Sequence, residues 1–173
     1  MGQAFALNGQ RACVQMPNSP LWSFGSNAFT ILLWAKFASA NGGQTLVSCD
    51  EGPGDHNKWI FWLNHGGIGL HANRANERRP DAGYASFRPT VNQWYHLALL
   101  RRSNQYFFFI DGVAISTHRD SHEMPPVNAP LTIGSAEGGN FFNGSIDEVC
   151  IYSRALDPSE IARACAEKRK EAH

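Results

Sequence analysis

The acidic side chains of this chain are not spaced as a catalytic pair would be. Asp147 and Glu148 are neighbours in a segment with the alternation of a β-strand. Their carboxylates are therefore expected on opposite faces of a sheet, where they cannot share a substrate. Asp50, Glu51 and Asp55 lie in a loop rich in Gly and Pro, without strand spacing. The sequence therefore does not predict catalysis by paired carboxylates.

The nucleophilic side chains also lack the partners that catalysis needs. The sequence has no G-x-S-x-G motif, which would present a serine nucleophile at a sharp turn. Ser48 and Cys49 lie near His56 in sequence, but no residue can be identified that would orient this histidine as a base. We therefore expect that the chain is not an enzyme.

The four cysteines permit more than one interpretation. No two of them are spaced as a C-x-x-C pair, so a structural zinc site is not expected; they are Cys13, Cys49, Cys150 and Cys165. Cys150 lies close to Cys165 across the turn into a predicted helix, and the two could form a disulfide. Free thiols that pack as small apolar side chains are the alternative. An export route would favour disulfides.

Short apolar runs separated by Gly and Pro indicate the elements that position these residues. Such turn signals recur about every ten residues, which is typical of a β-sandwich. A chain of 173 residues without a linker forms one domain, residues 1–173, and can bury roughly 70% of its unfolded surface. The sequence predicts an all-β fold, a two-sheet antiparallel jelly roll whose inner faces pack together.

One helix is predicted at the end of the chain, over about residues 158–170. Asp157 is the expected N-cap, Pro158 the first helical residue, and Glu160 the second half of a capping box. This helix follows a strand that contains the β-branched residues of segment 146–151. The apolar residues of the helix share one face: Ile161, Ala164 and Cys165.

The charge of the chain argues against several classes of partner. Fifteen basic and fifteen acidic residues give no net charge, so neither nucleic acid nor an anionic membrane is an expected partner. The cluster from Arg74 to Arg79 is the one basic patch, and we interpret it as a solvated loop. No apolar run is long enough to span a membrane, and no signal peptide precedes Ala4.

Seven segments, in order, resemble one family along almost the whole chain. The last contains Phe142, Gly144 and the run Ile-Asp-Glu-Val from residue 146, followed by an Arg-Ala-Leu turn. Together they resemble the laminin-G-like domains of the concanavalin A-like lectin and glucanase superfamily, bacterial type. The resemblance implies a jelly roll. The matching segments are 6–9, 29–36, 46–48, 94–98, 109–112, 131–134 and 142–156.

The resemblance also allows a comparison with the catalytic motif of enzymes in the family. Relatives that cleave polysaccharides have a Glu-x-Asp-x-(x)-Glu pattern on one strand, and retaining cleavage needs two carboxyl groups about 5 Å apart. No segment of this sequence matches the pattern. The opening and closing strands pair in the family, which would place Cys13 and Cys150 on neighbouring strands. A Cys13–Cys150 disulfide is thus a second possible pairing.

A structural calcium ion is implied at the meeting point of the first and last strands. The resemblance gives Asp147 as the carboxylate ligand, with Asn8 or Gly9 supplying a further oxygen. The alternative is that Asp147 caps a local turn by accepting backbone N–H bonds. The acid-rich segment 49–57 lacks the regular spacing of an EF-hand, so we interpret it as a solvated loop.

Aromatic residues supply a predicted binding surface. The family pattern places Phe61 in the core, which sends Trp62 outward, and His71 shares that outer face if its apolar neighbours point inward. By the same alternation Phe107 and Phe109 point outward. Such aromatics on a concave sheet could stack on sugar rings. A one-residue register slip would reverse each assignment. Further assignments are His96 outside, and Trp34 and Trp94 in the core.

We therefore expect a noncatalytic carbohydrate-binding module, one part of a larger secreted bacterial protein and located outside the cell or in the periplasm. The alternative is a protein-interaction or adhesion domain that binds through its loops. If the segment 73–79 contacts sugar, an acidic or sulfated polymer becomes the favoured ligand. The residues predicted to bind glycan are Trp62, His71, Phe109, Asp55, His56, Arg74 and Asn140.

Overall fold

The chain forms a sandwich of two six-stranded antiparallel sheets, as predicted. The computed structural model describes residues 3–77 and 81–171. The first sheet, here called the helix-covered sheet, has the order β1 (Phe5–Asn8), β12 (Asn143–Tyr152), β3 (Phe29–Phe37), β8 (Trp94–Arg102), β9 (Gln105–Ile110) and β10 (Val113–Arg119). The second, here called the concave sheet, has the order β2 (Val14–Met16), β11 (Leu131–Ile133), β4 (Gln44–Asp50), β5 (Lys58–Asn64), β6 (Gly67–Asn73) and β7 (Gly83–Ser86).

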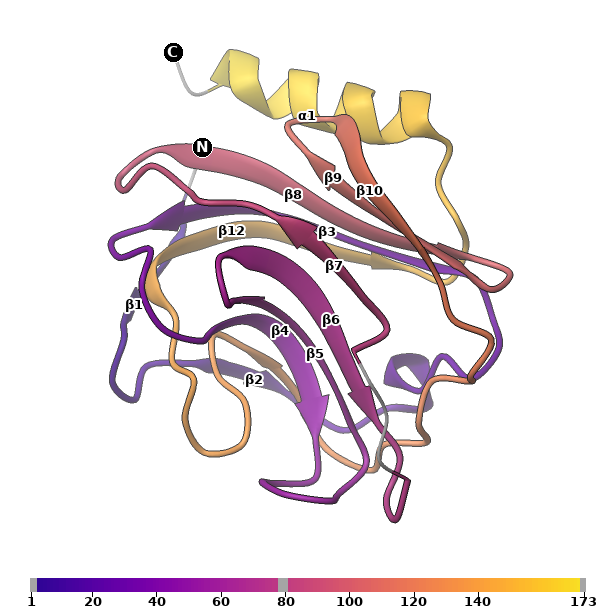
Figure 1. Cartoon of the computed structure of the whole chain (residues 1–173). Helices are drawn as coiled ribbons and strands as arrows, with labels where there is room; N and C mark the ends of the chain where they lie inside the picture. Colours follow the sequence, from indigo (N-terminus) through magenta and orange to yellow (C-terminus); the bar gives the residue numbers. More distant parts are fainter. Residues whose placement is uncertain (1–2, 78–80, 172–173) are drawn as a thin grey trace.

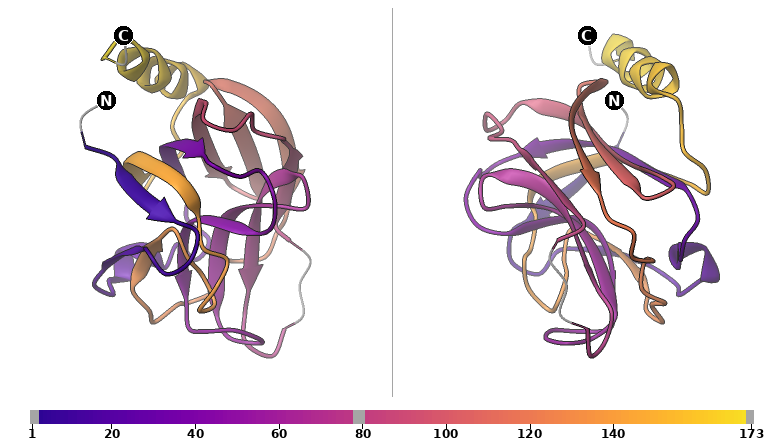
Figure 2. Two further views of the ribbon diagram at one scale, coloured as in Figure 1. Left: turned by 90° about the vertical axis from the view of Figure 1, so that its left-hand side faces the viewer. Right: turned by 45° about the vertical axis from the view of Figure 1, so that its right-hand side comes forward.

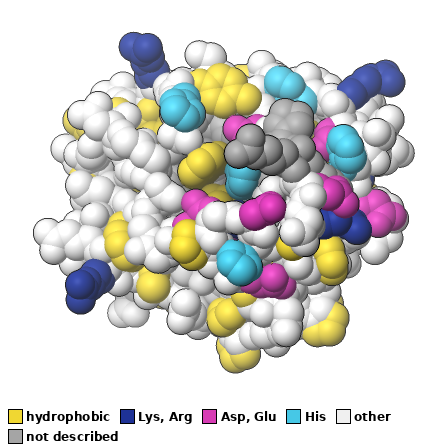
Figure 3. All heavy atoms as spheres, turned by 60° about the horizontal axis from the view of Figure 1, so that its bottom comes forward, with side chains coloured by type: hydrophobic (Ala, Val, Ile, Leu, Met, Phe, Trp, Pro, Cys, Tyr) yellow, Lys and Arg dark blue, Asp and Glu magenta, His cyan; other side chains and the backbone are white. Residues whose placement is uncertain are grey.

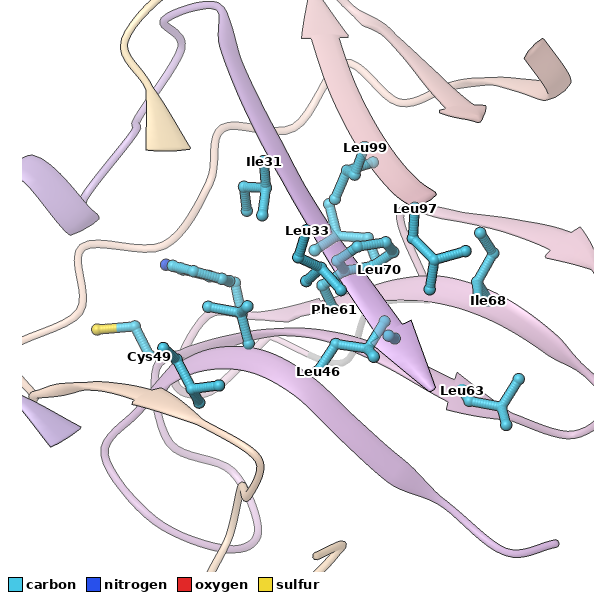
Figure 4. Close-up of a cluster of buried hydrophobic side chains, with 14 of the residues drawn as sticks. Ile31, Leu33, Leu46, Cys49, Phe61, Leu63, Ile68, Leu70, Leu97 and Leu99 are labelled. Atoms are coloured by element: carbon cyan, nitrogen blue, oxygen red, sulfur yellow. The ribbon is translucent and has the colours of Figure 1, made fainter. Parts of the chain in front are cut away.

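The inner faces of both sheets form the main core. In Figure 4, Ile31 and Leu33 of β3 and Leu99 of β8 approach Phe61 of β5 and Leu70 of β6 from the opposite sheet. Each buried aliphatic side chain of this kind contributes roughly 1.5–3 kcal/mol. A one-residue slip of any of these strands would move its apolar set out of the core, so packing selects the observed register.

The helix α1 (Pro158–Glu171) begins as the capping signals predict. The Asp157 carbonyl accepts the first helical bonds, and the Asp157 N–H donates to Glu160 Oε2 at 2.8 Å. Glu160 also binds the Arg154 guanidinium through two bonds of 2.8 and 2.9 Å. The helix lies over the outer face of the helix-covered sheet, on the side away from the concave sheet (Figures 1 and 2).

This helix buries aromatics that strand alternation sends outward. Phe107 and Phe109 do lie on the outer face of β9, but Ile161 of α1 packs there with Phe109, which is only 1% exposed. A second apolar core thus fills the space between helix and sheet. The prediction that Phe109 belongs to an open platform is wrong, because alternation identifies a face and not what covers it.

Of the two tryptophans assigned to the core, Trp34 is buried and Trp94 is not. Trp94 is only half-buried, on the outer face of the helix-covered sheet, where Lys36 Nζ lies 5.3 Å from its ring centroid. Trp34 is buried, but it shares that outer face with His96, at 5.4 Å between ring centroids. His96 faces outward as predicted, yet it is fully buried. The outer face of this sheet is therefore largely covered.

A β-bulge changes the expected directions of Asp147 and Glu148. Asp147 pairs with Trp34, the register then shifts before Cys150, and Glu148 has a φ of 52°. Glu148 lines a small cavity with Trp34 and His96, so it lies on the same outer side as Asp147. The prediction of opposite faces is wrong, because the bulge adds one residue to the alternation.

None of the four cysteines, all of which are among the described residues, forms a disulfide. Cys13 directly precedes β2 of the concave sheet, whereas Cys150 belongs to β12 of the other sheet. The expectation of neighbouring strands is therefore wrong for this pair, although β1 and β12 do pair. Burial raises the pKa of the Cys49 thiol to about 12, so it behaves as a small core side chain.

Candidate functional site

Trp62 and His71 lie side by side on the outer face of the concave sheet. They extend from adjacent strands, β5 and β6, with ring centroids 5.8 Å apart, and both are partly exposed. This confirms the outward direction predicted for the two residues. The strands β4, β5 and β6 bow toward the other sheet, so the outer face is concave (Figure 1). Figure 3 shows histidine, acidic and hydrophobic side chains around a hollow on this side of the molecule.

Gly69 is buried between two aromatic rings. It pairs with Trp62 on one side and Tyr84 of β7 on the other. A Cβ atom at Gly69 would lie 3.7 Å from Trp62 Nε1 and 3.6 Å from Tyr84 Cδ2. Trp62 and Tyr84 are themselves partly exposed, and neighbouring aromatic rings suit the flat apolar face of a ring-shaped ligand.

Asp81 orients the histidine of this surface. Its Oδ1 atom lies 2.8 Å from Nδ1 of His71, and both side chains are partly exposed. Because a carboxylate only accepts hydrogen bonds, Nδ1 carries the proton, and Nε2 is the nitrogen left for another partner. The site therefore combines two aromatic rings with a positioned polar group.

Three of the predicted loop residues lie together at the Lys58 end of β5. Asp55 accepts hydrogen bonds from Asn73 Nδ2 at 3.1 Å and from the Asn76 N–H at 3.2 Å, and the His56 carbonyl accepts from Asn73 at 2.9 Å. Arg74 lies 3.9 Å from Glu77 and 3.6 Å from Glu123. These contacts fasten two loops together. Arg78 and Arg79 of the same predicted basic patch lie outside the described residues.

Lys58 holds this end of the site together, a role that its sequence position did not reveal. Its side chain is 1% exposed, and Nζ donates to the carbonyls of Gly52 at 2.7 Å and Gly54 at 2.8 Å, and to the Glu137 carboxylate. Asp50 Oδ1 accepts the N–H groups of Gly52 and Glu137 at 3.0 and 3.2 Å. A single ammonium thus joins the 50–57 loop to the 134–139 segment.

Asn140 lies at the opposite end of β5. Its carbonyl accepts from the Thr45 N–H at 2.8 Å. Its Oδ1 atom and that of Asn64 would lie 3.0 and 3.5 Å from a Cβ atom on Gly43. Since β5 has seven residues, about 20 Å separates the Lys58 and Asn64 ends of the surface. The predicted residues are therefore spread along one strip, with Trp62 and His71 at its middle and Phe109 absent from it.

The residues predicted to bind calcium do not form one ligand set. Asn8 pairs with Asn143 in the ladder, and Asp147 lies four residues, about 13 Å, further along β12. Asn8 Oδ1 accepts three local backbone N–H bonds, from Gln10, Arg11 and Ala12, at 3.0–3.3 Å. Asp147 Oδ1 accepts the Glu148 N–H at 2.9 Å. Both side chains therefore cap local turns, and Gly9 adds no ligand near Asp147.

The chain belongs to the concanavalin A-like lectin/glucanases superfamily, since a family model of laminin G type matches residues 8–162. A search of curated proteins by sequence found no match. Within the described residues, no helix is long and apolar enough to cross a membrane.

Solved structures with the same fold include sugar-binding domains. One is domain 4 of AbnA, an extracellular arabinanase from Geobacillus stearothermophilus, in complex with arabinotriose. Its TM-score is 0.78 at 21% identity, covering 95% of this chain and 77% of that chain. Another is the CBM40 of the Ruminococcus gnavus IT-sialidase bound to α2,3-sialyllactose, with a TM-score of 0.70 at 18% identity, covering 90% and 97%. A pentraxin from Limulus polyphemus has a TM-score of 0.66 at 13% identity, covering 92% and 80%.

Proposed function

We propose that this chain is a noncatalytic carbohydrate-binding module that holds a glycan against the outer face of the concave sheet. The observation that carries the proposal is the pair of partly exposed aromatic side chains, Trp62 and Tyr84, on either side of Gly69 and beside the His71–Asp81 pair. Sugar rings present C–H faces that pack on aromatic rings, while hydroxyl groups need a few fixed polar partners. The surface supplies both.

Further support comes from the related structures and from the carboxylates. The arabinanase domain and the CBM40 are structures with bound sugar, which favours the same class of ligand here. The Asp147 carboxylate is buried, and one of its oxygens is used by a backbone N–H, which argues against a catalytic pair with Glu148. We place the domain outside the cell or in the periplasm, as one module of a larger secreted protein.

The first test is a glycan array followed by substitution of the central tryptophan. Trp62→Ala should weaken binding of the selected glycan roughly thirtyfold, since a central aromatic contact in a binding surface is worth about 2 kcal/mol. Trp94→Ala is the matched control, because Trp94 is a half-buried tryptophan on the other sheet. The glycan affinity of Trp94→Ala should equal that of the parent. Both variants should keep the far-UV circular dichroism spectrum of the parent.

Two outcomes would contradict the proposal. Equal glycan affinity of Trp62→Ala and the parent would remove the tryptophan from the site. Failure of the array to detect any glycan would favour the alternative that the domain binds protein.

A further inference from the structure

A cavity of about 640 Å³ opens at the Asn64 end of the concave surface. Its walls come from three separate segments, which are the connection between β3 and β4, the hairpin between β5 and β6, and the residues that follow β7. The apolar part of the lining is Ala40, Leu63 and Phe87, and the polar side chains are those of Asn41, Asn64, His65 and Arg88. The volume is large enough for a monosaccharide-sized group.

The cavity has a cation and no acid in its lining. Arg88 is exposed, and no carboxylate of the described residues lies within ion-pairing distance of its guanidinium. Arg102 and Arg154, by contrast, pair with Asp157 and Glu160. An arginine stays charged at any physiological pH, and its planar fork matches a carboxylate or sulfate.

The hairpin holds the arginine in place. His65 and Gly66 have φ values of 48° and 79°, typical of a tight two-residue hairpin turn. A Cβ atom on Gly66 would lie 3.6 Å from Arg88 Nε, so the guanidinium rests against this bare backbone. The preference of this backbone conformation for glycine keeps that position free of a side chain.

Tyr84 connects this cavity to the aromatic surface. Its hydroxyl donates to the His65 carbonyl at 2.9 Å and would lie 3.9 Å from a Cβ atom on Gly66. The ring of the same tyrosine borders Gly69 beside Trp62. Tyr84 therefore lies between the aromatic surface and the cavity. A sugar chain stacked on Trp62 and Tyr84 would direct its next unit toward Arg88.

We propose that this cavity receives the anionic group of an acidic sugar unit, with Arg88 binding a carboxylate or sulfate and the amides of Asn41 and Asn64 binding hydroxyls. The proposal rests on the proposed function, because it names the class of glycan for the same surface. The negative group would replace water at a cation that has no protein counter-ion among the described residues.

The test uses three sugars that differ only at the sixth carbon, which are galactose, galacturonate and galactose 6-sulfate. Each is titrated at millimolar concentration into the isotope-labelled chain, and the NMR signals of the Gly66 amide and the Arg88 side-chain N–H are followed. The expected result is saturable shifts with galacturonate, with the sulfate, or with both, at an affinity at least tenfold above that for galactose. The two anionic arms separate carboxylate from sulfate recognition.

Arg88→Gln should abolish the preference for the anionic sugars, and Arg119→Gln, at an exposed arginine of β10, should leave it intact. Equal responses to all three sugars, no response to any of them, or a preference that survives in Arg88→Gln would each overturn the proposal. The two proposals fail separately. Array binding to neutral glycans alone keeps the proposed function and removes the acidic ligand. A silent array with intact galacturonate shifts would show that the cavity binds a single acidic sugar while the aromatic surface holds no extended glycan.

Discussion

Lys58 carries a buried charge, and hydrogen bonds offset the free-energy cost of removing it from water. An ammonium removed from water needs oxygen partners, and this one has two carbonyls and a carboxylate. Since Glu137 is partly exposed, the pair is not fully removed from solvent. The contacts connect two loops beside the glycan surface, so the residue contributes to the shape of the site as well as to stability.

Lys58→Met should lower the free energy of unfolding by about 3 kcal/mol, because it leaves two carbonyls and a carboxylate without their buried donor. Methionine retains the apolar stem, so the loss reports on the ammonium. Urea denaturation measures the change, and Lys36→Met, at a half-buried lysine whose contact is an aromatic ring, is the control. A loss below about 1 kcal/mol would mean that the loops are held by other contacts.

The sequence predicted the direction of a side chain correctly where strand alternation alone determines it. Trp62 and His71 face outward because their apolar neighbours fill the core. Lys58 has the same parity, but nothing in its sequence position shows that a loop returns to cover it. Asn8 and Asp147 failed as partners because ladder register, which depends on contacts distant in sequence, separates them.

The terminal helix is the element that decides which sheet remains open. Strand alternation predicts an outward face on both sheets, and the sequence also predicts the helix and its cap correctly. What alternation cannot predict is where the helix docks. Its apolar face packs on Phe109 and Leu100, so one aromatic face is sealed and the other remains available. The element order alone therefore could not assign the site to a sheet.

The cap of α1 makes the attachment of the helix dependent on pH. Hydrogen bonds from Arg154, and then from the Asp157 backbone, lower the pKa of Glu160 from 4.5 to about 2. A carboxyl group with a lowered folded pKa stabilises the folded state above its unfolded pKa. That contribution disappears as the pH falls from about 4.5 to about 2.

Glu160→Gln should therefore lower the melting temperature at pH 7, and the difference from the parent should disappear near pH 2. Thermal melts followed by circular dichroism across this pH range measure it. The control is Glu167→Gln, because the Glu167 carboxylate is exposed and its 3.9 Å separation from Arg163 is too long for a hydrogen bond. A difference that persists unchanged at pH 2 would show that the glutamine acts through packing and not through charge.

At the scale of the whole molecule, recognition must come from local groups. The chain has no net charge, so long-range attraction contributes little to binding an acidic or a neutral polymer. The open face and the helix lie on opposite sides of the sandwich (Figure 2). A glycan on the concave sheet would therefore leave the helix side free for contacts with other parts of a larger protein.

Calcium, which the family resemblance implies, is a prediction for the whole molecule that remains to be tested. The described residues contain no group of three or more acidic, histidine or cysteine side chains placed to hold a metal. The oxygens of the 50–57 loop that converge do so on the Lys58 ammonium. The prediction is checked by melting the chain in a chelator and in millimolar calcium, and equal melting temperatures would contradict it.

A bound ion would be easy to detect in this experiment. Calcium at a hundred times its dissociation constant would add about 2.7 kcal/mol of stability. For a chain of this size that free energy raises the melting temperature by roughly 5–10 °C. A rise of that size in calcium, lost in chelator, would show that ligands outside the described contacts assemble around the ion. Magnesium at the same concentration separates such a site from an effect of ionic strength, because its small octahedral shell fits a calcium site poorly.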